Sequence, residues 1–200
     1  MLIDLLFTPM CIGCKSLGSH LCLGCRSSIQ IASFDLRSPN LEVVSAGQYE
    51  GWLRDSVVRY KSGARSDVYG LSQVVDLMLP RASRIVPAPT SPEKVRDRGF
   101  DTIGQLSRQV VRRRRDVTVV PVLRLTRTVR DQVGLTADER RANLTGAIRS
   151  TRPVQGDFVV LDDVVTTGST VQECARALKK AGADRVFVIS LCASRNRGYL

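Results

Sequence analysis

The feature that most constrains the fold of this 200-residue chain is the segment FVVLDDVVTTGSTVQECARALKKAGADRV, at residues 158–186. Its β-branched, apolar start predicts a buried strand over Asp157–Leu161, followed by a helix over Ser169–Ala181 that ends before Gly182. A second strand is expected over Arg185–Leu191. Strand, helix and strand in this order indicate a mostly parallel α/β sheet flanked by helices.

Two carboxylates and a hydroxyl-rich turn lie between that strand and helix. The carboxylates are Asp162 and Asp163, and the turn consists of Thr166, Thr167, Gly168, Ser169 and Thr170. Backbone N–H groups in such a turn, at a helix N-terminus, bind anions, and a glycine allows close approach or a positive φ. Because carboxylates repel a bare phosphate, the pattern predicts a ligand that also has ribose hydroxyls or brings Mg²⁺. An Asp pair beside an ordinary helix cap is the alternative.

The preceding part of the chain continues the alternation of strands and helices. Strands are expected at Val43–Ala46, Arg84–Pro87 and Val117–Val122, and helices at Met1–Met10, Leu53–Tyr60, Asp67–Leu79 and Asp101–Arg115. A Pro-rich turn is expected after Pro87, and the Arg-rich stretch Arg124–Asn143 shows no clear period.

Four of the six cysteines form two CxxC units near the start: Cys11, Cys14, Cys22 and Cys25. They supply four thiolates for tetrahedral zinc, and a segment this small needs a metal to order it. Free or redox-active thiols are the alternative. With Asp35–Asn40 as a linker, we expect a zinc-binding module over residues 1–38 and an α/β domain over 39–200.

The remaining cysteines and the single histidine are given structural roles. Cys174 and Cys192 are expected to be small buried hydrophobic residues. His20 is expected to face solvent, because the four cysteines already complete a zinc site.

The formal net charge of +11 comes mostly from arginine. This balance suits an anionic partner, either a phosphorylated metabolite or a nucleic acid, and a merely solvated basic surface is the alternative. The run Arg112–Arg115 wraps around its helix, so we interpret it as a solvated face rather than a nucleic-acid contact. Aromatic residues for base stacking are sparse, Trp52 and Tyr60 being the nearest candidates.

Apolar runs in the chain fall far short of the roughly 18 residues that a membrane span needs. The start lacks the basic region of a signal peptide. We therefore expect a cytoplasmic protein without membrane insertion.

Several motifs together resemble one family. The segment around Asp162 resembles the 5-phosphoribosyl-1-pyrophosphate (PRPP) motif of type I phosphoribosyltransferases, and DDVVTTGST is most similar to the ComF family. The paired CxxC units are similar to that family's zinc module. Its other elements resemble Tyr60-Lys61-Ser62-Gly63, Pro87-Ala88-Pro89 with Arg98-Gly99-Phe100, and Gln132…Leu135…Arg140…Asn143…Ala147. Two departures are Asp101-Thr102 in place of Asn-Gln, and Ile148 in place of Phe.

The resemblance implies a type I phosphoribosyltransferase-like fold and a Mg²⁺-dependent enzyme that transfers a phosphoribosyl group to an unknown acceptor, releasing pyrophosphate. Asp162 and Asp163 would be the catalytic residues that hold the ribose, and Thr166–Thr170 would hold the 5-phosphate. A pyrophosphate loop would use Pro87, Ala88, Lys94, Arg96 and Arg98. A Pro-rich surface turn with solubilising charges is the alternative for that loop.

The resemblance also implies that the polar segment Thr126–Asn143 is a flap that excludes water from the reactive sugar. Its candidate ligand contacts are Gln132, Arg140 and Asn143. A solvated helix through Ala137–Leu144 is the alternative.

Membership of the ComF family would also imply a link to natural competence and DNA uptake. The competing hypothesis is therefore a non-catalytic protein that binds single-stranded DNA through its zinc module and basic surface. A structural partner of a competence helicase or another DNA-processing protein is a third hypothesis.

Overall fold

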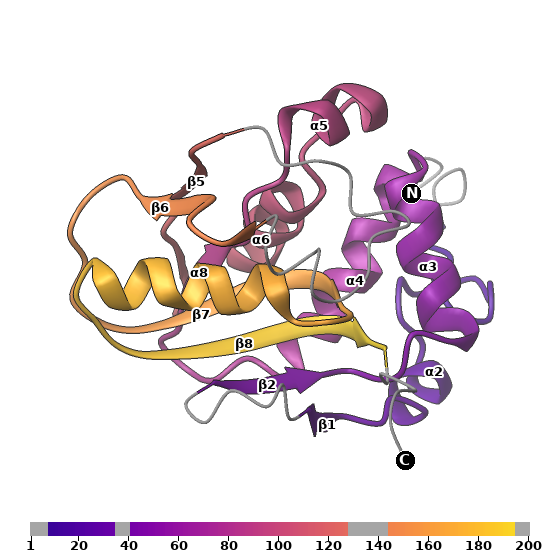
Figure 1. Cartoon of the computed structure of the whole chain (residues 1–200). Coiled ribbons are helices and arrows are strands. Elements are labelled where there is room, and N and C mark those ends of the chain that lie inside the picture. Colours follow the sequence, from indigo (N-terminus) through magenta and orange to yellow (C-terminus); the bar gives the residue numbers. More distant parts are fainter. Residues whose placement is uncertain (1–7, 35–40, 128–143, 195–200) are drawn as a thin grey trace, which may run out of the picture.

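The computed structural model of the chain describes residues 8–34, 41–127 and 144–194. A six-stranded sheet with the strand order β1-β2-β8-β7-β3-β4 lies at its centre (Figure 1). The strands are β1 (Ala32–Phe34), β2 (Glu42–Ser45), β3 (Arg84–Pro87), β4 (Thr118–Val119), β7 (Gly156–Val165) and β8 (Ala183–Ala193). All neighbouring strands are parallel except β1 and β2. The predicted mostly parallel α/β fold is confirmed.

Helices cover both faces of this sheet. On one face pack α3 (Gly51–Lys61), α4 (Val68–Asp76) and α6 (Thr102–Arg113), and on the other α8 (Ser169–Lys180) (Figure 1). Alternate strand residues divide between two cores: Leu161 joins the cluster with α3, α4 and α6, whereas Val160 joins that with α8. The short helices are α2 (Leu23–Ser27), η1 (Arg65–Asp67) and α5 (Pro92–Arg98).

The chain changes direction across the sheet between β3 and β7. From β3 it passes through α6 to β4 at the edge, and from β7 it passes through α8 to β8 on the opposite side. Ligands of open α/β sheets bind outside the carboxyl ends of the strands at such a switch point. The carboxyl ends of β3 and β7 are therefore the place where this fold favours a ligand.

Several elements differ from the sequence-based predictions. Strand β7 continues to Val165 rather than ending at Leu161, because its ladder with β8 runs to Ala193. The strand predicted over Val117–Val122 is reduced to β4. The expected Pro-rich turn contains helix α5, which Ser91 caps by accepting a hydrogen bond from Lys94 N.

A separate two-stranded ribbon was not predicted. It consists of β5 (Leu123–Leu125) and β6 (Ile148–Ser150), paired antiparallel. Three-residue strands are too short to show a period of two, so no sequence pattern indicates them. Residues 1–7, which hold most of the predicted N-terminal helix, and the linker Asp35–Asn40 lie outside the described residues.

The two isolated cysteines behave as predicted. Cys174 and Cys192 are both fully buried in the core. None of the helices within the described residues is long and apolar enough to span a membrane.

Candidate functional site

The acid pair lies at the carboxyl end of β7. Successive side chains of a strand point to opposite faces of the sheet, so Asp162 and Asp163 diverge. Asp163 Oδ1 lies 2.8 Å from Lys61 Nζ, at the end of α3. On the other face, Asp162 lies near Cys174 of α8: burial raises the pKa of that thiol, and the charge of Asp162 adds to the shift. The two carboxylates thus occupy different environments.

The surroundings of Asp162 alter the pKa of its carboxyl. Burial raises the pKa of its carboxyl to about 7, and the negative charge of Asp163 adds to the shift. The cations of Lys61 and Lys94 act in the opposite direction. Beside it on β8, the buried hydroxyl of Ser190 has no hydrogen-bond partner among the described residues. A carboxyl that titrates near neutrality and an unpaired hydroxyl therefore lie side by side.

The hydroxyl-rich turn connects β7 to α8. Gly168 has φ +77° and ψ 0°, in the left-handed region, so the predicted positive φ is confirmed. Since Gly168 is also the N-cap residue, no side chain caps α8 at this position. Thr167 Oγ1 and Ser169 Oγ lie 2.9 Å apart, which brings two hydroxyls together at the helix N-terminus. This end of α8 has the polarity that suits a phosphate.

The first part of the predicted pyrophosphate loop adjoins the acid pair. Pro87 pairs in register with Leu161, and Ala88 N donates to Leu161 O at 2.9 Å. Lys94, in the first turn of α5, is near enough to lower the pKa of Asp162. The structure therefore brings Pro87, Ala88 and Lys94 to the end of β7.

The other two loop candidates lie farther along α5. Arg96 is exposed, and Arg98 Nη1 donates to Thr102 Oγ1 at 3.4 Å, towards the start of α6. Neither has a described contact with Asp162 or Asp163. The family departure at Asp101 has a structural explanation: its Oδ1 caps α6 by accepting from Gly104 N, and also from Thr90 Oγ1, both at 3.1 Å.

Lys61 is a site residue that sequence reasoning missed. The family-like segment Tyr60-Lys61-Ser62-Gly63 contains this lysine, but the sequence alone gives the lysine no role. Tyr60 is 2% exposed, and its hydroxyl donates to Thr102 O at 2.9 Å, which fixes the end of α3. The suggestion that Tyr60 stacks on bases is therefore wrong.

The predicted flap residues Gln132, Arg140 and Asn143 lie outside the described residues. The described chain enters this segment after β5 and leaves it before β6.

The four N-terminal cysteines form a cluster. The sulfur atoms of Cys11, Cys14, Cys22 and Cys25 all lie within 4.8 Å of one another. Tetrahedral zinc with bonds of about 2.3 Å needs sulfur atoms roughly 3.8 Å apart, so the set fits a structural metal such as zinc. Backbone N–H groups of Cys22 and Cys25 donate to Cys11 Sγ and Cys22 Sγ, both at 3.4 Å. A β-carbon at Gly13 would come within 2.6 Å of Cys25 Sγ, so this position requires glycine.

The cysteine cluster packs on the α/β part of the chain. Ile12 O accepts hydrogen bonds from Arg59 Nη2 at 2.8 Å and Ser56 Oγ at 2.9 Å, both on α3. Trp52 Nε1 donates to Ser28 Oγ at 3.2 Å. His20 is partly buried and stacks on Tyr69 of α4 at 4.8 Å, rather than simply facing solvent. These contacts give the aromatic residues here a structural role.

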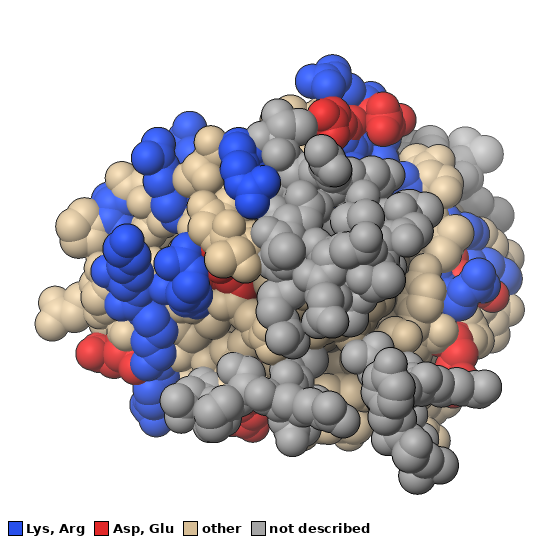
Figure 2. Space-filling view, viewed as in Figure 1, with Lys and Arg blue, Asp and Glu red and all other residues tan. Residues whose placement is uncertain are grey.

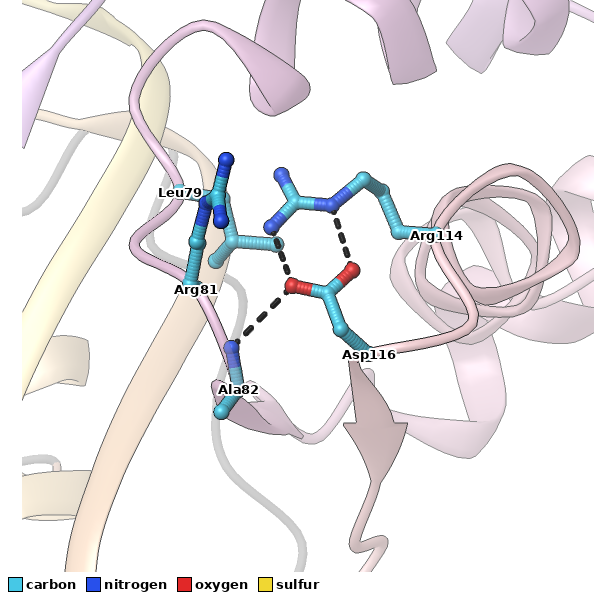
Figure 3. Close-up of a pocket in the computed structure, with 5 residues that line it drawn as sticks. All are labelled: Leu79, Arg81, Ala82, Arg114 and Asp116. Carbon is cyan, nitrogen blue, oxygen red and sulfur yellow. Dashed lines mark hydrogen bonds and ion pairs between the residues drawn. The ribbon is translucent and has the colours of Figure 1, made fainter.

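An open hollow of about 720 Å³ lies away from the acid pair (Figure 3). It is lined by Leu79, Arg81, Ala82, Arg114 and Asp116. These residues precede β3 and β4, so the hollow is at the amino ends of these strands, whereas the acid pair is at the carboxyl end of β7. Arg114 and Asp116 form a two-bonded ion pair there, with both distances 2.7 Å.

Comparison with known proteins relates the chain to two curated proteins over much of its length. It is 37% identical over 127 residues to DNA utilization protein YhgH of Escherichia coli, which covers 63% of this chain and 55% of YhgH. It is 32% identical over 120 residues to Competence protein F of Haemophilus influenzae, which covers 58% and 51% of the two chains. The chain thus spans about half the length of these relatives.

A shorter match concerns a ribose-phosphate pyrophosphokinase. The chain is 60% identical over 35 residues to Ribose-phosphate pyrophosphokinase 1 of Archaeoglobus fulgidus, covering 18% of this chain and 12% of that protein. No protein-family model matches the chain. The resemblance to the ComF family is nevertheless confirmed by the longer matches, and the chain is a homologue of YhgH and Competence protein F.

Proposed function

We propose that the chain binds PRPP and transfers its phosphoribosyl group to an acceptor, with release of pyrophosphate. The observation that carries the proposal is the arrangement at the end of β7. Asp162 and Asp163 are followed at once by a turn whose Gly168 has a positive φ and starts α8. The short match to a ribose-phosphate pyrophosphokinase supports the same class of ligand.

In this proposal the turn Thr166–Thr170 holds the 5-phosphate. Its hydroxyls and the N-terminus of α8 supply donors and a favourable dipole. The carboxylates hold the ribose hydroxyls and stabilise positive charge that develops at C1 of the sugar. Lys61 acts as a positioning residue, because its ion pair fixes the direction of Asp163.

The pyrophosphate group would lie towards β3 and α5. Lys94 offers a cation, and Pro87 and Ala88 hold the backbone beside the acid pair. Carboxylate oxygens are suitable ligands for Mg²⁺, which would enter with PRPP and neutralise its charge. In the transfer, a lone pair of the acceptor forms a bond to C1, the C1–O bond breaks, and pyrophosphate leaves with the electron pair. The acceptor then loses its proton.

The flap and the domain division belong to the same proposal. Gln132, Arg140 and Asn143 would contact the bound ligand when the segment that contains them covers the sugar. Residues 1–38 would form a zinc-binding module, and residues 39–200 would form the phosphoribosyltransferase domain.

Calorimetric titration of Mg·PRPP into the wild-type protein tests the ligand. We expect saturable binding below about 1 mM, in the range of ordinary enzyme substrates, and at least tenfold weaker binding by the variant Asp162→Asn/Asp163→Asn. The control is Asp157→Asn, at the start of β7, whose carboxylate pairs with Arg185 on the surface. Absence of saturable binding by the wild type, or equal binding by the double variant, would rule the site out. Where binding is found, slow pyrophosphate release from the complex, with water as the acceptor at C1, would show that the bound protein promotes cleavage of the C1–O bond.

A DNA-related role is a second candidate. The relatives are named for DNA utilization and competence, and the net charge of +11 suits a polyanionic partner. Single-stranded DNA and a helicase or another DNA-processing protein are the partners we propose. Binding of an oligonucleotide with a steep dependence on salt would support this role.

A further inference from the structure

The β5–β6 ribbon places two arginines directly opposite each other. Arg124 on β5 pairs in register with Arg149 on β6. Their sequence neighbours Leu123 and Ile148 are buried, whereas both arginines are exposed. Like charges that face each other across two strands destabilise the pair. An anion that contacts both side chains would remove this repulsion.

Helix α8 extends this basic surface. Its side packs against the ribbon, since Ile148 N donates to Glu173 Oε1 at 3.4 Å and Arg176 Nη2 donates to Ile148 O at 3.3 Å. Arg176, Lys179 and Lys180 stand three and four residues apart, on one face of the helix. We call the combined surface the ribbon patch: Arg124, Arg149, Arg152, Arg176, Lys179 and Lys180. Figure 2 shows Lys and Arg gathered over α8 and the ribbon.

Much of the charge of the ribbon patch is not neutralised. Within the described part of the chain, no side chain forms an ion pair with Arg124, Arg149 or Arg152. The carboxylate of Glu173 forms an ion pair with Arg176, with 2.7 Å between Oε1 and Nη2. Arg124 and Arg149 are far apart in the sequence, and the pairing of β5 with β6 brings them together.

The arginine run Arg112–Arg115 differs from the ribbon patch because part of its charge is paired within the molecule. Arg113 pairs with Asp76 at 3.0 Å, and Arg114 pairs with Asp116 at 2.7 Å. Two of its four cations are therefore used within the molecule. The run is a less suitable polyanion surface than the ribbon patch.

We propose that the ribbon patch is the docking surface for the phosphate backbone of a nucleic-acid strand. This inference deepens the DNA-related candidate function above and rests on it. Guanidinium groups match phosphate oxygens through paired hydrogen bonds, and four of the six residues of the patch are arginines. The exposed large hydrophobic side chains of the described residues are Met10, Leu17, Leu23, Ile31, Val58 and Tyr69, all outside the patch. The patch thus lacks apolar anchors for a lipid bilayer and rings for base stacking, which favours contact with phosphates.

The test compares two variants that lose the same charge. Arg124→Gln/Arg149→Gln alters the ribbon, and Arg112→Gln/Arg115→Gln alters the arginine run at the end of α6. Each is titrated against a fluorescent oligothymidylate of about 30 nucleotides over a series of salt concentrations, by anisotropy. Loss of two phosphate contacts should lower the slope of log K against log salt by about 1.4, and weaken binding about tenfold at low salt. The control variant should stay within about twofold of the wild type.

Each remaining outcome contradicts the proposal in a distinguishable way. Equal losses in the two variants would show that net charge alone matters, so the surface assignment would fail while the DNA-related function stands. No binding by the wild type would remove that function together with the surface. Tighter binding to phosphatidylserine vesicles than to the oligonucleotide, lost in the ribbon variant, would assign the patch to a membrane surface instead. Circular dichroism of both variants verifies that they are folded.

Discussion

Lys61 and Asp163 form an ion pair of 2.8 Å although 102 residues separate them in the chain. The lysine is at the carboxyl end of α3 and the aspartate is near that of β7, so the pair ties a helix to the strand that carries the candidate site. The side chains are only 25% and 14% exposed, so solvent screens them incompletely.

Replacing Lys61 by Met should destabilise the protein and weaken PRPP binding. Removal of one partner leaves the Asp163 carboxylate uncompensated, at a cost of about 1–3 kcal/mol in the free energy of unfolding. We expect PRPP affinity to fall about tenfold, equivalent to about 1.4 kcal/mol, and Lys61→Arg to retain most of it. Urea unfolding and calorimetry measure the two effects.

Titration of the Asp162 carboxyl distinguishes a positioning role of Lys61 from a purely stabilising one. Because the charge of Lys61 opposes the upward shift in the pKa of Asp162, Lys61→Met should raise that pKa further, whereas Lys61→Arg should not. NMR titration of the Asp162 side chain measures this, with Lys180→Met as the control. An unchanged Asp162 titration in Lys61→Met would contradict the assigned role.

The raised pKa of Asp162 predicts a stability that depends on pH. Its pKa of about 7 in the folded protein exceeds the ordinary value of 3.8, so the unfolded chain loses this proton first. This pKa difference adds to the free energy of unfolding, in full below pH 3.8, and the contribution is lost as pH rises towards 7. Asparagine does not titrate, so the free energy of unfolding of Asp162→Asn should rise by about 1–2 kcal/mol relative to that of the wild type between pH 5.5 and pH 8.5.

Urea unfolding of both proteins at pH 5.5 and pH 8.5 checks the direction of this change in relative stability. Asp157→Asn is the control, because the pairing with Arg185 lowers the pKa of Asp157 and places its titration below this range. If the advantage of Asp162→Asn were the same at both pH values, Asp162 would not titrate near neutrality.

The cysteine cluster predicts one bound zinc ion per chain. Cys14→Ser should lose the metal and lower the melting temperature by several degrees, because metal binding contributes directly to the folding of such small segments. Cys174→Ala, which alters a buried cysteine of α8, should keep the metal even if it is less stable. Elemental analysis of purified protein counts the zinc. Absence of zinc from the wild type would identify the cluster as free thiols, and zinc retained by Cys14→Ser would show that Cys14 is not a required ligand.

Gly168→Ala should weaken ligand binding more than it destabilises the fold. With φ at +77°, alanine costs about 1 kcal/mol of backbone strain and alters the turn that we assign to the 5-phosphate. We expect at least tenfold weaker PRPP binding. Gly51→Ala is the matched control, since Gly51 also has a positive φ but lies at the other end of α3 from Lys61. Equal affinities of the two variants would show that the turn does not contact the ligand.

Local patterns in the sequence predict the long elements well. Strands β3, β7 and β8 and helices α3, α4, α6 and α8 each have enough residues for an apolar period to appear. The CxxC spacing likewise predicts a cluster that four sulfur atoms within 4.8 Å confirm. The ribbon of β5 and β6 escaped prediction because each strand has three residues and is specified by its partner.

The features that can be identified from the sequence are local: the apolar strand, the Asp pair, the turn with Gly168, and the four cysteines. Each depends on residues close together in the chain, so composition and spacing suffice to identify it. Long-range packing, by contrast, pairs Lys61 with Asp163, places Lys94 near Asp162, and sets Arg124 opposite Arg149. Such contacts arise from the packing of helices on a sheet and from strand register, which join residues that no local pattern relates.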